Sequence, residues 1–149
     1  MMRRKVFLIV ALCLLALLPA YAQKGLQIDS LFNGRLVNVS AMTESIVSGK
    51  KLSPYNLDYF RSVRFVADDG KIAKVATWIR NDSMIAEEKD VESEGGRLVY
   101  ALLKFPRRMD KNRYVGYQVK RIGGSDYVTV VYMEGAATVE DLKVIFKHR

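Results

Sequence analysis

The stretch Val128–Phe146, VTVVYMEGAATVEDLKVIF, combines an apolar strand, a glycine turn and an amphipathic helix. Its first part is apolar on both faces, which is typical of a strand buried inside a sheet. In its second part, Val139, Leu142, Ile145 and Phe146 recur at helical spacing and form one apolar face. The C-terminal end therefore predicts a sheet with a helix packed on it.

A strand, a glycine and a helix start are also the layout of an anion-binding loop. Here, however, Thr138 is followed three residues later by Asp141, a pattern that resembles a capping box. Glu140 and Asp141 also place negative charge at the positive end of the helix dipole. An anion would be repelled there, so we expect Gly135 only to turn the chain.

Upstream of this stretch, two glycine pairs mark hairpin turns. Gly95-Gly96 and Gly123-Gly124 each separate runs that are apolar or alternating, which is typical of β-hairpins. The runs predict a four-strand meander over residues 84–92, 97–105, 113–122 and 127–133. The first run carries many acidic residues, so we expect it to be a solvated edge strand that resists aggregation.

The N-terminal half adds a strand and a second helix. The run SVRFVA, residues 62–67, alternates between two faces, and Asp68 or Asp69 can cap a helix over 71–82. Residues 34–49 are rich in Val, Ser and Thr, which favours extended structure. The sequence thus predicts an α+β fold: an antiparallel sheet with a four-strand meander and two main helices packed on one face.

The N-terminus has the pattern of a secretory signal peptide. Basic residues in Met1–Lys5 precede the apolar run Val6–Leu18, and Ala20 and Ala22 then form a cleavage pattern. We expect residues 1–22 to be a cleaved signal peptide and residues 23–149 to form a single α+β domain. The mature protein would be exported, soluble after cleavage, and located in the periplasm or outside the cell. Its oligomeric state stays open.

Few residues are available for catalysis or metal binding. The only cysteine, Cys13, lies within the expected signal peptide, and the only histidine is His148. An ordinary zinc site and a Ser-His-Asp triad therefore have too few candidate residues. The sequence predicts no cofactor, no metal and no enzymatic activity. The net charge of +8 falls on removal of the signal peptide, which leaves a mildly basic chain.

The best candidate for a binding surface is a basic loop, KFPRRMDKNR, at residues 104–113. Its cations could contact an anionic partner such as lipopolysaccharide, a glycan or an acidic protein; they are Lys104, Arg107, Arg108, Lys111 and Arg113. The alternative is a solvated loop, because charge runs are commonly surface features. Nucleic acid is not expected, since an exported protein rarely meets it.

Three segments resemble one family. EGGRLVYALLKF at 94–105, DYVTVVYMEGAATVEDLKVIF at 126–146 and the stretch 42–82 resemble a small exported domain family of unknown function from Gram-negative Bacteroidetes. The resemblance implies export, and it carries over no catalytic residue. Some related exported domains stand beside sigma-factor regulators, which would imply a role in envelope signalling.

Together these patterns favour an exported non-catalytic domain that binds a protein or an anionic envelope component. One alternative is a carboxylate-dependent enzyme acting on an envelope polymer, which requires two acids converging in a pocket. Another is a small-ligand-binding module with an apolar groove between sheet and helices.

Overall fold

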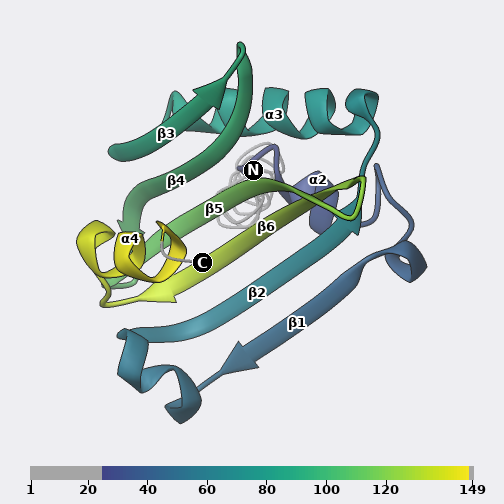
Figure 1. Ribbon diagram of the computed structural model, residues 1–149. Helices are drawn as coiled ribbons and strands as arrows, with labels where there is room; N and C mark the ends of the chain where they lie inside the picture. Colours follow the sequence, from purple (N-terminus) through teal and green to yellow (C-terminus); the bar gives the residue numbers. More distant parts are fainter. Residues whose placement is uncertain (1–24, 148–149) are drawn as a thin grey trace, which may run out of the picture.

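Three two-residue turns fold the C-terminal half of the chain into consecutive hairpins of one antiparallel sheet. The computed structural model describes residues 25–147, so the expected signal peptide lies outside the described part of the chain. The sheet has six strands in the order β1-β2-β6-β5-β4-β3 (Figure 1). They are β1 (Thr43–Ser48), β2 (Leu57–Val66), β3 (Glu88–Glu94), β4 (Arg97–Arg108), β5 (Lys111–Ile122) and β6 (Ser125–Gly135).

The remaining elements are short or lie against the sheet. They are α2 (Asp29–Phe32), η1 (Val39–Ala41), η2 (Lys50–Tyr55), α3 (Asp69–Ser83) and α4 (Val139–Lys147). The α+β class predicted from the sequence agrees with this arrangement. The sequence predicts extended structure over residues 34–49, but only β1 is a strand there, and it follows the 3₁₀ turn η1.

The two main helices pack on opposite faces of the sheet, which corrects the prediction that both pack on one face. Ala101 and Leu103 of β4 share a core cluster with α3, whereas Tyr100 and Leu102 belong to a second cluster with Leu142 of α4. In Figure 1, α4 lies in front of the sheet and α3 behind it. Because β4 is apolar on both faces, one helical layer cannot bury both of them. We call the two sides the α3 face and the α4 face.

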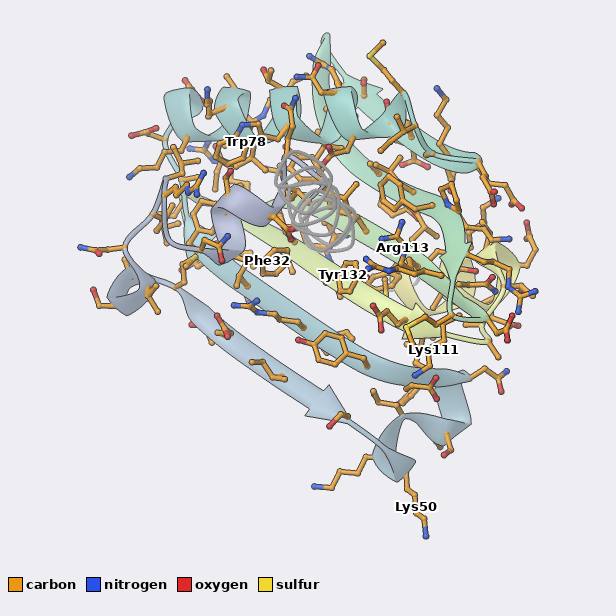
Figure 2. All side chains as sticks on the ribbon, turned by 180° about the vertical axis from the view of Figure 1, so that it is seen from behind. Phe32, Lys50, Trp78, Lys111, Arg113 and Tyr132 are labelled. Atoms are coloured by element: carbon orange, nitrogen blue, oxygen red, sulfur yellow. The ribbon has the colours of Figure 1, made fainter. Side chains whose placement is uncertain are left out.

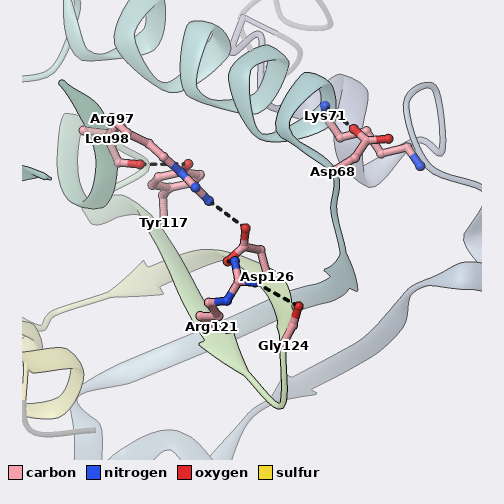
Figure 3. A network of polar contacts seen from close by, with 8 residues as sticks. All are labelled: Asp68, Lys71, Arg97, Leu98, Tyr117, Arg121, Gly124 and Asp126. Carbon is pink, nitrogen blue, oxygen red and sulfur yellow. Dashed lines mark hydrogen bonds and ion pairs between the residues drawn. The ribbon is translucent and has the colours of Figure 1, made fainter. Parts of the chain in front are cut away.

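The start of α3 follows the sequence prediction. Asp68 is the N-cap, and its carboxylate accepts a hydrogen bond from the Lys71 backbone N–H at 2.8 Å (Figure 3). At the other end of the helix, Asp82 is a buried residue with only 3% of its surface exposed. Its carboxylate accepts the backbone N–H groups of Gln27 at 2.8 Å and Ile28 at 3.0 Å. These two bonds attach the N-terminal segment to the end of α3.

Burial raises the pKa of Asp82, and the two backbone hydrogen bonds partly oppose that rise.

The β5–β6 end of the sheet has its own polar contacts (Figure 3). Asp126 pairs with Arg97 at 3.3 Å and Arg121 at 3.9 Å. The buried Tyr117 hydroxyl donates to the Leu98 carbonyl at 3.2 Å, and burial raises its pKa to about 12. These contacts join β4, β5 and β6 at the end away from the β4–β5 turn.

The link from β6 to α4 is a tightly packed turn. A Cβ on Gly135 would lie 2.6 Å from the Asn56 carbonyl oxygen, so glycine is needed for close backbone approach as well as for the turn. Thr138 and Asp141 form the expected reciprocal capping box: the Asp141 carboxylate accepts the Thr138 N–H at 2.9 Å, and the Thr138 hydroxyl accepts the Asp141 N–H at 3.2 Å.

All three hairpin turns have the same backbone shape but not the same residues. The turn glycines have φ of 57° and 78° at Gly95-Gly96, and of 58° and 83° at Gly123-Gly124. The β4–β5 turn has φ of 51° at Met109 and 62° at Asp110. Left-handed backbone costs about 1 kcal/mol or more for a residue with a side chain, although Asp tolerates it better than most. Met109 is therefore the strained residue of the three turns.

Candidate functional site: a cationic groove on the α3 face

A groove lies on the α3 face, between α2 and the β4–β5 turn. It has a volume of about 550 Å³. Four cations line it, and we call it the cationic groove after them: Arg61, Arg108, Lys111 and Arg113. Figure 2 views this face and shows Phe32, Tyr132, Arg113 and Lys111 together on it, with Lys50 pointing away at the far edge of the sheet.

The register of the sheet explains why these side chains meet. Arg61 of β2 pairs with Tyr132 of β6, and Arg113 of β5 pairs with Glu134 of β6. Since directly paired residues share a face, Arg61, Tyr132, Glu134 and Arg113 all point to the α3 face. The α2 residues Asp29 and Phe32, together with Tyr59, Met109 and Leu26, complete the lining.

Arg61 is held firmly where β2 meets α2. Its guanidinium Nη2 donates to the Phe32 carbonyl at 3.2 Å, and its Nε lies 3.5 Å from a Glu44 carboxylate oxygen. The guanidinium also lies over the Phe32 ring, 5.0 Å from the ring centre. Arg61 is thus a positive charge whose position is set before any ligand arrives.

Tyr132 forms the polar floor of the groove. Its hydroxyl donates to a Glu134 carboxylate oxygen at 2.6 Å, and its ring meets the Tyr59 ring edge-on at 6.2 Å. Burial, followed by the bond to Glu134, raises the pKa of Tyr132 well above its usual range, and Arg113 opposes the rise. Tyr132 is therefore a neutral hydrogen-bond donor at ordinary pH.

The basic segment predicted as a loop is instead a hairpin: β4 continues to Arg108 and β5 starts at Lys111. Phe105 pairs directly with Arg113, and a register shift follows between Phe105 and Arg108 before the strands meet again at Arg108 and Lys111. Lys111 pairs with Asp58 at 3.3 Å, and the Arg113 Nε donates to the Pro106 carbonyl at 3.2 Å.

The structure brings together three of the five predicted site residues, Arg108, Lys111 and Arg113. The other two do not line the cationic groove. The Arg107 guanidinium turns back to donate to the Asp110 carbonyl at 2.9 Å. Lys104 belongs to the α4 face, because it pairs with Tyr114 of that face in the sheet, and it lies 3.6 Å from Glu88.

Sequence reasoning missed the other half of the groove, above all Arg61, Tyr59, Tyr132 and Glu134. Tyr59 and Arg61 alternate along β2, and Tyr132 and Glu134 alternate along β6, so each pair shares a face of its strand. That alternation was a usable signal. What the sequence did not show is that β2 lies beside β6, and that pairing brings the two sets together.

A second groove, apolar and about 180 Å³ in volume, lies on the α4 face. It is the kind of space that the small-ligand alternative requires, and its walls come from η2, β2 and α4, with Leu52, Phe60 and Phe146 among the lining residues. Within residues 25–147, no group of three or more potential metal ligands occurs. In the same range, no helix is long and apolar enough to cross a membrane.

Comparison with known proteins gives one family. No match was found among curated proteins or among solved structures. The family described as Family of unknown function (DUF6108) matches residues 15–146, which is most of the chain. The expected resemblance to a family of unknown function agrees with this match, while its taxonomic origin and export stay expectations. By this match, the chain belongs to the DUF6108 family of unknown function.

Proposed function

We propose that this protein is an exported, non-catalytic binding domain whose cationic groove takes an anionic component of the cell envelope. The observation that carries the proposal is the convergence of Arg61, Arg108, Lys111 and Arg113 on one groove from three different strands. A cluster of like charges in a concavity focuses the electrostatic potential and attracts ligands of opposite sign.

The groove also contains two carboxylates, Asp29 and Glu134, so four cations face two acids. Glu134 already accepts the Tyr132 hydroxyl. Lys111 and Arg61 also have acidic partners just outside the lining, Asp58 and Glu44, with which an anion would compete. The contacts of Arg61 with α2 and Glu44 hold its guanidinium in position before a ligand arrives. Such preorganisation lowers the free-energy cost of binding.

Binding can be measured by titrating the purified protein with three envelope-type anions: lipopolysaccharide, polygalacturonate as an acidic glycan, and vesicles of phosphatidylglycerol. The double variant Arg108→Glu/Lys111→Glu reverses two groove charges. The matched control, Lys50→Glu/Lys51→Glu, reverses two charges on the exposed η2 segment, outside the groove.

We expect at least one anion to bind, and the groove variant to weaken it about tenfold or more, because each reversed contact changes the Coulomb energy by about 1 kcal/mol or more. The control should retain wild-type affinity at equal net charge. No binding of any of the three, or equal loss in both variants, would refute the proposal.

The two carboxylates are also the observation that favours a second candidate, a carboxylate-dependent enzyme acting on an envelope polymer. In that case Asp29 and Glu134 would act as the paired acids. Purified protein would then release soluble fragments from a cell-wall polymer, and Glu134→Gln would abolish the release. Equal turnover by wild-type protein and Glu134→Gln would rule out this role for Glu134.

A further inference from the structure

The three hairpin turns provide an internal comparison. Two of them use Gly-Gly at left-handed backbone angles, and the third places Met109 and Asp110 at the same angles. The turn that keeps its side chains is the one beside the cationic groove, and Met109 lines that groove. Met109 is also 87% exposed, the most exposed of the large apolar side chains in residues 25–147.

We infer that Met109 is a ligand-contacting residue of the cationic groove, and that the ligand is an amphiphilic anion. This inference rests on the function proposed above and narrows its ligand class. The cations Arg108, Lys111 and Arg113 would bind a phosphate-like headgroup, and Met109 would contact the alkyl part beside it.

The rest of the lining fits such a ligand. Tyr59 of β2 adds partly exposed aromatic surface to the lining, whereas Phe32 is buried beneath the Arg61 guanidinium and adds little. Methionine is flexible and polarizable, so one side chain can pack against alkyl chains of varied shape. A strongly hydrated anion without an apolar part would leave Met109 without a contact.

The test uses the full chain and a single substitution, Met109→Asn. Asparagine accepts left-handed backbone more readily than methionine and leaves the net charge unchanged. The variant should therefore unfold at the wild-type temperature or higher. The matched control is Met84→Asn, because Met84 is 81% exposed and is not a lining residue of the groove.

Three probes separate the parts of the ligand: dodecyl phosphate below its micelle concentration, phosphatidylglycerol vesicles, and inorganic polyphosphate, which lacks an alkyl part. We expect Met109→Asn to weaken dodecyl phosphate or vesicle binding about tenfold, equivalent to about 1.4 kcal/mol. Polyphosphate binding should not change. If Met109→Asn loses affinity for dodecyl phosphate, the ligand is a single amphiphilic molecule. If it loses affinity for the vesicles alone, the ligand is a membrane surface.

Wild-type affinity of Met109→Asn for both alkyl probes would overturn the inference, and so would an equal loss in Met84→Asn. In either case, continued weakening by Arg108→Glu/Lys111→Glu would leave the proposed function standing. If that double variant also binds every probe like the wild type, the proposed function fails as well.

Discussion

Replacing Asp82 with alanine should be among the most destabilising single changes in this protein. The substitution removes both acceptors for the Gln27 and Ile28 backbone N–H groups, which lie 2.8 and 3.0 Å from the carboxylate. A buried donor left without a partner costs about 1–3 kcal/mol, which applies to the Ile28 N–H. The part-buried Gln27 N–H costs less, so the two together cost about 2–4 kcal/mol. The free energy of unfolding of a domain is about 5–15 kcal/mol, so Asp82→Ala would remove a large fraction of the stability.

Urea unfolding followed by circular dichroism measures this loss as a lower midpoint with an unchanged slope. The matched control is Asn81→Ala, which removes only an exposed 2.9 Å hydrogen bond to the Gln27 side chain and should cost less than about 1 kcal/mol. Asp82→Asn keeps one acceptor oxygen, so its urea midpoint should lie between those of Asp82→Ala and Asn81→Ala. A midpoint for Asp82→Ala equal to that of Asn81→Ala would refute the reasoning.

The same carboxylate gives a pH signature. Burial raises the pKa of Asp82 above its ordinary 3.8, so the unfolded chain loses this proton at lower pH than the folded protein does. The stabilisation that Asp82 contributes is therefore complete below pH 3.8, and it is lost as the pH rises through the pKa of the folded protein. The stability advantage of the wild type over Asp82→Asn should shrink across that acidic window.

Three further predictions concern other parts of the chain. Gly135→Ala should lower the free energy of unfolding by about 1–3 kcal/mol in urea unfolding, because its Cβ would lie 2.6 Å from backbone atoms. The control Gly116→Ala should be nearly neutral, because the nearest atoms to its Cβ would lie at 3.9 Å. Similar losses in the two variants would contradict the packing argument. Tyr117 has a folded pKa of about 12 against an ordinary 10, so stability should fall between pH 10 and 12, and a Tyr117→Phe variant with an equally steep fall would show that this tyrosine is not responsible. Expression in an exporting Gram-negative host should yield a chain whose N-terminal sequence starts at Gln23, and an intact N-terminus would exclude cleavage after Ala22.

Local patterns predicted much of this fold. The glycine pairs, the Asp68 cap and the Thr138–Asp141 capping box depend on residues close in sequence, and the structure contains each of them. The placement of the helices did not follow from local pattern. Both faces of β4 are apolar, and that observation already required two covering layers, but which helix covers which face depends on contacts between distant segments.

The candidate site was only half predictable for the same reason. The run of cations at residues 104–113 is visible in the sequence, and strand alternation then separates it, with Lys104 on the α4 face and Arg113 on the α3 face. Arg61 was not singled out, because it is one arginine in an alternating strand. Its role depends on Phe32 and Glu44, which approach it only after β1 and α2 are in place.

The attachment of the N-terminal segment to Asp82 also bears on the order in which the protein folds. Gln27 and Ile28 bond to a residue 55 and 54 positions later in the chain, whereas the hairpins of β3 to β6 close through two-residue turns. Because contacts between segments distant in sequence form more slowly, we expect the β3–β6 hairpins to assemble first and α2 to dock late. In pulsed hydrogen exchange during refolding, the amides of Gln27 and Ile28 should become protected after those of β4 and β5. Earlier protection at Gln27 and Ile28 would reverse that order.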